Sequence, residues 1–182
     1  ARKTRGLSTR DTRNVTSVFG LFDGCISLES LDLSGFDTSN VTTMRFMFGG
    51  CQSLKSINFS GFNTMKVTDM MGMFGPSMLG HNANTGGPGC MSLESLDLTM
   101  FDTSNVTDMT MMFSRCYNLK EVILSGWNTS NVKSMVSMFE ECYSLRNLDL
   151  SSFNTESLAN MGSMFISCKN LEAIDLSAFN TS

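Results

Sequence analysis

A short segment recurs along the chain at a fixed interval, and this recurrence constrains the fold more than any other feature. The segment FDTSNV at residues 36–41 is followed by related segments that begin at Phe62, Phe101, Trp127, Phe153 and Phe179. The spacing is 26 residues at every step except the one from Phe62 to Phe101, where it is 39. Such self-similarity is the signature of a solenoid, in which each repeat is covered by its neighbours. We therefore expect residues 1–182 to form a single solenoid of about six and a half repeats.

One repeat, LESLDLSGFDTSNVTTMRFMFGGCQS at residues 28–53, predicts two kinds of structure. In its first half the apolar residues alternate around Leu31 and Leu33, which predicts a short strand followed by a turn. The second half, from Val41 to Cys51, has apolar residues at i, i+3, i+6, i+7 and i+10, which predicts a helix of about three turns. Residues 37–40 would cap this helix at its start. Stacking such units predicts an α/β solenoid with short parallel strands on one side and short helices on the other.

The same columns of residues are apolar in every repeat and form the predicted core. The strand columns contain Leu, Ile, Val and Phe at the positions of Leu28, Leu31 and Leu33. The predicted helix core consists of Met44, Met70, Met109, Met135 and Met161, with Phe22, Phe48, Phe74, Phe113, Phe139 and Phe165 beside them. A stripe of methionines can also mark a metal or adaptable binding face, but at this spacing beside phenylalanine it favours core packing.

Charged residues occupy one further column, in which the sign mostly alternates between neighbouring repeats. Its members are Glu29, Lys55, Glu94, Lys120, Arg146 and Glu172. Parallel stacking places like positions about 4.8 Å apart, so alternating signs support the register. The net charge of −4 also hides an asymmetry, because residues 1–13 carry +4 and the remainder carries −8.

The motif LxxLDLSxFxTSxVxxMxxMFxxC, written from these columns, resembles the BspA-like leucine-rich repeats of bacterial and protist surface proteins. It is most similar to the subtype found in mycoplasma and lactobacillus lipoproteins and adhesins. The resemblance implies a right-handed leucine-rich-repeat superhelix that acts as a non-enzymatic binding or adhesion module, extracellular or at the cell surface. It carries no catalytic residue to transfer. The chain departs from the motif in its basic first half-repeat, residues 1–13, and in an insertion at residues 75–89.

Six cysteines fall once per repeat in a single column. Stacked positions about 4.8 Å apart would permit disulfides. However, stacked side chains point the same way and each cysteine completes an apolar stripe, which favours buried free thiols. A zinc site is disfavoured because the chain has no CxxC and a single histidine.

A threonine column, from Thr12 through Thr38 to Thr181, is the least variable in the chain. It could form an ordered-water, ice-binding surface, or contribute with Asp37 and Asp102 to calcium sites. The repeated need for the same turn favours a capping role instead.

The sequence lacks the residues that a catalytic site would need. A nucleophilic site would have to use His81 within a glycine-rich loop, and there is no GxxxxGK motif for phosphate. We expect no enzymatic activity, no cofactor and no metal. No run of about 18 apolar residues predicts a membrane span, and a basic head without interleaved aromatic residues does not predict nucleic-acid binding.

We expect the partner to be a protein or glycan on a cell surface or matrix, bound by the exposed strand face. The candidate partner-binding residues there are Asp32, Asn58, Asp97, Asp149 and Asp175. The insertion adds Met78, Leu79 and His81 as candidates, because insertions in solenoids project from one face. Asn40 and Asn105, in N-x-S/T sequences on predicted turns, are candidate glycosylation sites.

An alternative function is that of a structural subunit that stacks head-to-tail into an extracellular filament. Its candidate contacts are the basic Arg2, Arg5 and Arg10 at one end, and Glu172, Asp175 and Phe179 at the other. Unlike ends that meet in this way make a heterologous contact, which produces an open filament.

Overall fold

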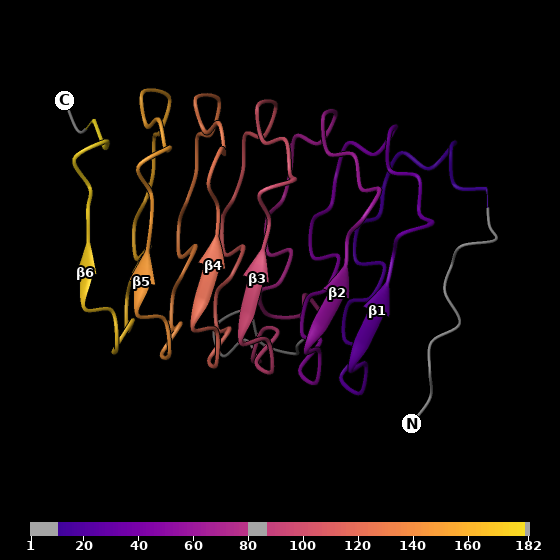
Figure 1. Cartoon of the computed structure of the whole chain (residues 1–182), viewed down its shortest axis with the longest axis horizontal. Helices are drawn as coiled ribbons and strands as arrows, with labels where there is room; N and C mark the ends of the chain where they lie inside the picture. The colour runs from indigo at the N-terminus through magenta and orange to yellow at the C-terminus, as the bar shows by residue number, and fades with distance from the viewer. Residues whose placement is uncertain (1–10, 80–86, 181–182) are drawn as a thin grey trace.

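The computed structural model describes residues 11–79 and 87–180, which wind into a coil of stacked repeats (Figure 1). Each repeat contributes one short strand, and the strands lie side by side along one face. The strands are β1 (Ser30–Asp32), β2 (Ser56–Asn58), β3 (Ser95–Asp97), β4 (Glu121–Ile123), β5 (Asn147–Leu148) and β6 (Ala173–Ile174). Their pairing confirms the predicted stacking of repeats in register.

The strands pair in parallel as β1–β2, β3–β4 and β5–β6. Leu31 is opposite Ile57, and Leu96 is opposite Val122, so the partners are equivalent positions of successive repeats. In β1, β3 and β4 the central residue is buried and its two neighbours are exposed. This is the alternation that a strand with one face on the core requires.

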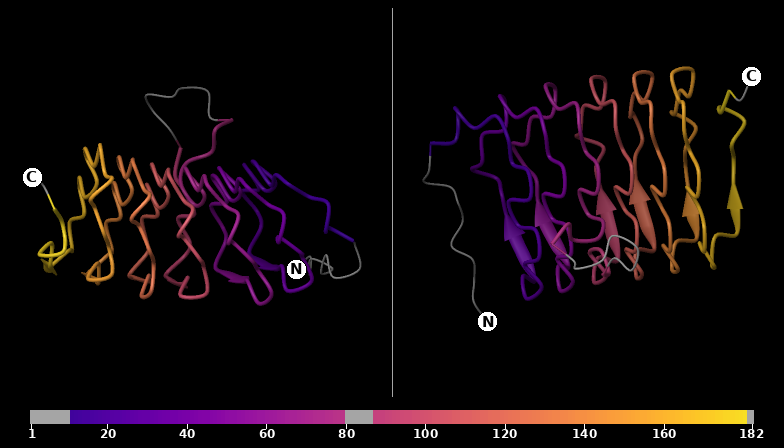
Figure 2. Two further views of the ribbon diagram at one scale, coloured as in Figure 1. Left: turned by 90° about the horizontal axis from the view of Figure 1, so that it is seen from above. Right: turned by 180° about the vertical axis from the view of Figure 1, so that it is seen from behind.

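A second hydrogen-bonded row runs along the opposite side of the coil and is continuous where the strands are not. Parallel bridges join, in order, Ser17, Thr43, Asp69, Asp108, Ser134 and Asn160. Figure 2 shows the repeats closer together along this side than along the strands. The spacing of stacked aromatic rings shows the same difference. The ring centroids of Phe48 and Phe74 are 5.4 Å apart, whereas those of Trp127 and Phe153, at the corner after the strands, are 6.3 Å apart. The coil therefore opens toward its strand face.

The predicted helices are wrong: no helix occurs in residues 11–79 or 87–180, and the segment from Val41 to Cys51 is a run of turns. Within it, Phe46 (φ 52°) and Gly50 (φ 63°) have left-handed backbone conformation. Two such residues only four positions apart are incompatible with a right-handed helix.

Backbone donors in this segment alternate between two kinds of partner. The amides of Met44 and Phe46 donate to the next repeat, to the carbonyls of Asp69 (3.0 Å) and Met71 (2.9 Å). The amide of Met47 instead donates within the repeat, to Met44 (3.1 Å). Hydrogen bonds between repeats thus replace the hydrogen bonds that a helix would make within itself. The tight i to i+3 turns still put Met44 and Met47 on the same side, where both are fully buried.

Most residues of the predicted core columns are buried where a repeat has neighbours on both sides, although Ile57 is only partly buried. Phe48, Phe74, Phe113 and Phe139 are fully buried and stack on one another at 5.3–5.6 Å. The prediction that Met161 lies in the core is wrong, because its side chain is 41% exposed. It belongs to the last complete repeat of the described coil, so only one side of it is covered.

The cysteine column consists of free thiols, as predicted. Four of the six are buried, and the thiol of each of these donates to a carbonyl of the preceding repeat; Cys116, for example, donates to Phe74 (3.4 Å). Burial raises the pKa of both Cys51 and Cys116 to about 12. The column therefore joins neighbouring repeats through neutral thiols.

We expect Gly72→Ala to destabilise the protein more than Gly126→Ala. Both glycines have positive φ, so alanine costs about 1–2 kcal/mol in backbone strain at either site. A Cβ at Gly72 would also overlap the Phe46 ring, adding roughly 1–3 kcal/mol, whereas a Cβ at Gly126 meets nothing within 4 Å. Denaturant unfolding of the two variants would measure the difference. Equal losses would show that the Phe46 ring moves aside without cost.

Candidate binding surface

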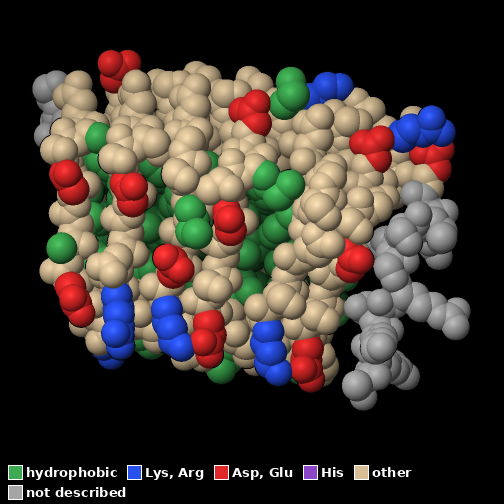
Figure 3. Space-filling view, in the orientation of Figure 1, with side chains coloured by type: hydrophobic (Ala, Val, Ile, Leu, Met, Phe, Trp, Pro, Cys, Tyr) green, Lys and Arg blue, Asp and Glu red, His purple; other side chains and the backbone are tan. Residues whose placement is uncertain are grey.

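The strand face presents a regular array of polar side chains. The first and third residues of β1 to β4 are exposed on either side of the central position. Figure 3 shows acidic and basic side chains in rows across this face, with hydrophobic atoms visible between the strands. The predicted candidates Asp32, Asn58, Asp97, Asp149 and Asp175 are all exposed here and form one column, which we call the Asp column.

Each member of the Asp column also shapes the turn after its strand. Oδ1 of Asp32 accepts a hydrogen bond from the amide of Ser34 (3.0 Å), and Oδ1 of Asp97 does so from Thr99 (3.0 Å). The same bond recurs at Asn58, Asp149 and Asp175. Such bonds, made two residues on, are Asx-turns. Sequence reasoning missed this role, although a serine or threonine two residues after each Asx residue is a signal that could have shown it.

These turn bonds favour the ionised form of the four aspartates in the column. The backbone amides of Ser34, Thr99 and Ser177 lower the pKa of Asp32, Asp97 and Asp175. The pKa of Asp149 is lowered by the hydroxyl, and then the amide, of Ser151. Hydrogen bonds to an ionised carboxylate favour that form. Four carboxylates therefore line this face at neutral pH.

Four members of the neighbouring charged column form ion pairs, whereas the Asp column contains a hydrogen bond from Asn58 Nδ2 to Asp32 Oδ1 (3.0 Å). Lys55 Nζ is 3.1 Å from Glu29 Oε2, and Lys120 Nζ is 2.7 Å from Glu94 Oε2. Among the ion pairs of the described residues, none includes a member of the Asp column. Exposed pairs of this kind contribute little stability but cancel each other's charge. The charged column has equal numbers of acidic and basic residues, so the net negative charge of the strand face comes from the Asp column and from Glu121.

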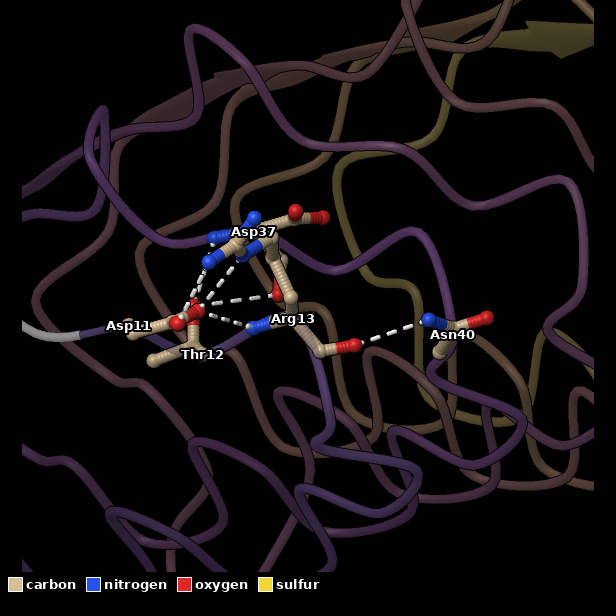
Figure 4. A network of polar contacts seen from close by, with 5 residues as sticks. All are labelled: Asp11, Thr12, Arg13, Asp37 and Asn40. Atoms are coloured by element: carbon tan, nitrogen blue, oxygen red, sulfur yellow. Dashed lines mark hydrogen bonds and ion pairs between the residues drawn. The ribbon is translucent and has the colours of Figure 1, made fainter.

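The members of the threonine column that the structure describes, Thr12 to Thr155, are buried and bond backbone groups of the next repeat. Thr129 is fully buried, and its hydroxyl both donates to the carbonyl of Asn154 and accepts from its amide, each at 2.8 Å. Figure 4 shows the first member, Thr12, making the same pair of bonds to Asp37. Buried hydroxyls cannot order surface water, so the ice-binding alternative is wrong. The predicted capping role is also corrected: the threonine hydroxyls bond each repeat to the backbone of the next one.

The candidate glycosylation residues use their side-chain amides within the fold. Nδ2 of Asn40 donates to the carbonyl of Arg13 (2.7 Å), and Nδ2 of Asn105 donates to that of Met65 (2.7 Å). Asn40 is half-buried and Asn105 is exposed. Their modification stays a prediction.

The described ends of the insertion, residues 75–79 and 87–89, leave the coil on the side opposite the strands (Figure 2) and are not part of the strand face. Met78 and Leu79 are 45% and 66% exposed, and His81 lies outside the described residues. The start of the insertion packs on the coil at Gly50, where an added Cβ would be 2.7 Å from that of Ser77. Beside it, desolvation raises the pKa of Asp23, and the Ser77 hydroxyl partly opposes this.

The predicted end-to-end contacts are described at one end only. Arg2, Arg5 and Arg10 lie outside the described residues. At the other end Glu172 and Asp175 are exposed, and the half-buried Phe179 stacks on Phe153 with centroids 6.4 Å apart.

Two open hollows lie near the last strand, away from the middle of the strand face. One, of about 250 Å³, is lined by residues that include Thr155, Met161 and Asn180. The other, of about 330 Å³, is lined by residues that include Arg146 and Glu172. Neither is lined by a member of the Asp column.

Within residues 11–79 and 87–180, no three His, Cys, Asp or Glu side chains are grouped so as to hold a metal ion. The same residues include no helix of the length and apolarity needed to cross a membrane.

Comparison with known proteins gives one family and one solved structure. A search of curated proteins found no match. A crystal structure of a leucine-rich repeat protein from Eubacterium ventriosum is similar to this chain at 20% identity and a TM-score of 0.48. That similarity covers 81% of this chain and 32% of the other, so this chain spans about a third of its length.

The family model described as "Mycoplasma protein of unknown function, DUF285" matches residues 1–85 and 88–182. The match stops and resumes within the insertion and includes every repeat on either side of it. The chain therefore belongs to the DUF285 family.

Proposed function

We propose that this protein is a non-enzymatic binding scaffold of a cell surface, and that its strand face docks a protein or glycan of another cell or of the matrix. The resemblance to BspA-like leucine-rich repeats supports the extracellular location and the adhesive role. The regular coil supports the scaffold role, because stacked repeats give an extended surface whose exposed residues vary without disturbing the core.

The observation that carries the proposal is the uncompensated charge of the Asp column. Asp32, Asp97, Asp149 and Asp175 are exposed, ionised and held in fixed orientation by their turns. Charges held in place before binding favour a partner of opposite sign and raise its association rate. A basic protein surface therefore fits this face better than an acidic glycan does.

Neutralising part of the Asp column is expected to weaken binding without unfolding the coil. The double variant Asp97→Asn/Asp149→Asn removes two charges, yet the Asn side chain can still make the turn bond, as Asn58 does. The matched control, Asp37→Asn/Asp102→Asn, removes two charges from another column, where Asn63 and Asn128 occupy equivalent places.

The measurement is binding of the labelled chain to a panel of immobilised matrix proteins and glycans at low and high salt. We expect a basic member of the panel to bind. The strand-face variant should weaken its affinity by about fivefold at low salt, at roughly 0.5 kcal/mol per charge, and by less at high salt. Equal effects of the strand-face and control variants would contradict the assignment of the site.

Head-to-tail assembly into a filament stays a prediction of the sequence. Its basic contacts lie outside the described residues, so no described contact bears on it.

A further inference from the structure

Ile123 breaks the Asp column in the middle of the strand face. It takes the position that an aspartate or asparagine occupies in the other repeats, and it is 39% exposed at the end of β4. An isoleucine cannot accept the Asx-turn bond that the other members make. At this position the repeat thus gives up a stabilising turn bond and leaves an apolar side chain in water.

Met100 is a second apolar exception, in the turn after β3. It is 47% exposed. Residues at this position of the other repeats are small, namely Gly35, Gly61, Gly126, Ser152 and Ala178. In the next repeat, a Cβ added at Gly126 would meet nothing within 4 Å, so the space there is open.

The exposure of these two residues is not an effect of the ends of the coil. Leu176 is exposed because it belongs to the last described repeat, whereas Ile123 and Met100 belong to repeats with neighbours on both sides. Scattered single apolar residues are ordinary on protein surfaces. Ile123 and Met100 lie in adjacent repeats, and each replaces the polar or small residue type that recurs at its position in the other repeats, so together they form a distinct feature.

Acidic side chains surround Ile123. Asp97 is its partner in the β3–β4 register, and Asp149 occupies the same column one repeat later. Glu121 is exposed two residues earlier on the same face of β4. An apolar centre within a charged rim is the usual anatomy of a protein-binding patch.

We infer that Ile123 and Met100 are the apolar anchor of the strand-face binding site, and that its occupant is a basic protein segment with an apolar side chain between lysines or arginines. The apolar side chain packs on Ile123 and Met100 while the cations pair with Asp97, Glu121 and Asp149. This inference rests on the proposed function and specifies the partner class.

Charge argues against other occupants. The strand face of a second copy of this chain would bring its own acidic column, since residues 14–182 carry a net charge of −8. Anionic lipid headgroups and sulfated glycans would meet the same repulsion. A neutral apolar partner would leave the acidic rim unpaired and desolvated, which costs free energy.

The test uses Ile123→Asp, which gives β4 the residue type that most repeats carry. Because aspartate restores the turn bond, the variant is expected to fold at least as well as the parent. The probes are two fluorescent nonapeptides, one with a leucine between two blocks of four lysines and one with serine in place of that leucine. Fluorescence anisotropy measures the affinity of each peptide for each protein.

We expect the parent protein to bind the leucine peptide about fivefold more tightly than the serine peptide, because only leucine gives apolar surface to bury. Ile123→Asp should reduce this ratio to near one, while the added charge leaves the serine peptide bound equally or more tightly. Met100→Gly, with the commonest residue of its column, should reduce the ratio in part. An unchanged ratio in Ile123→Asp would overturn the anchor.

The same peptides separate this inference from the proposed function. Asp97→Asn/Asp149→Asn should weaken both peptides, whatever the central residue. If that variant weakens both but Ile123→Asp leaves the ratio unchanged, the acidic strand face stands and the anchor is wrong. If neither set of substitutions changes binding, the strand face is not the site and both are wrong.

Discussion

Raising the pH from 8 to 11 is expected to remove much of the protein's stability, because the folded state holds protons on buried thiols that the unfolded chain releases. Burial raises the pKa of Cys51 and Cys116 to about 12, and it raises the pKa of Cys90 and Cys142 as well. A thiol in the unfolded chain has an ordinary pKa of about 9. The stability contributed by each raised thiol is therefore complete below pH 9 and is lost as the pH rises toward 12.

The expected size follows from proton linkage. Each thiol that is protonated in the folded state and ionised in the unfolded state lowers the free energy of unfolding by about 1.4 kcal/mol per pH unit. Two pH units above 9, the loss is roughly 2–3 kcal/mol for each deeply buried thiol. Several such thiols acting together would use up most of the stability of a typical domain.

The measurement is denaturant unfolding at a series of pH values, followed by the fluorescence of the buried Trp127. The thiolate absorbance of the buried cysteines, near 240 nm, should appear with unfolding and not before it. Cys116→Ala should reduce the slope of the free energy of unfolding against pH by about the contribution of one thiol. It should also lower stability slightly at every pH, because it leaves a small cavity. Cys25→Ser is the matched control, because Cys25 is exposed. A slope that is the same in Cys116→Ala and in the parent would refute this account.

Replacing Thr129 by valine is expected to cost about 2–4 kcal/mol of stability, although the two side chains have nearly the same shape. The Thr129 hydroxyl satisfies both the amide and the carbonyl of Asn154 at the join between two repeats. Valine leaves these two backbone groups without partners, and each costs roughly 1–3 kcal/mol when shielded from water. Thermal or denaturant unfolding measures the loss.

Two controls separate the hydroxyl from the rest of the side chain. Thr129→Ser keeps the hydroxyl and removes one methyl group, so its cost should be about 1 kcal/mol. Thr99→Val removes a hydroxyl from the exposed strand face, where water can replace the bond to Asp97, and should cost less than about 0.5 kcal/mol. Similar losses in Thr129→Val and Thr129→Ser would show that the bond between repeats contributes little.

The candidate surface was only partly visible in the sequence. The exposed column of Asp32, Asp97 and Asp149 follows from strand alternation and was predicted in full. Its structural role in the turns and its lack of cationic partners required coordinates. The break in that column at Ile123 stands in the sequence too, but its significance depends on knowing that the repeats on both sides leave it exposed.

The repeat length, the stacking in register, the buried Leu, Met, Phe and Cys columns and the place of the insertion were determined by the sequence alone. They follow from periodicity, because equivalent residues of a stacked array must share one environment. Burial of Thr129 and the path of the chain from Val41 to Cys51 were decided only by the tertiary structure. An apolar residue at every third position suits a helix and a series of i to i+3 turns equally well. What separates them is the left-handed backbone at Phe46 and the bonds from Met44 and Phe46 to the next repeat. Those bonds exist only once a second repeat is in place, so no pattern within one repeat can reveal them.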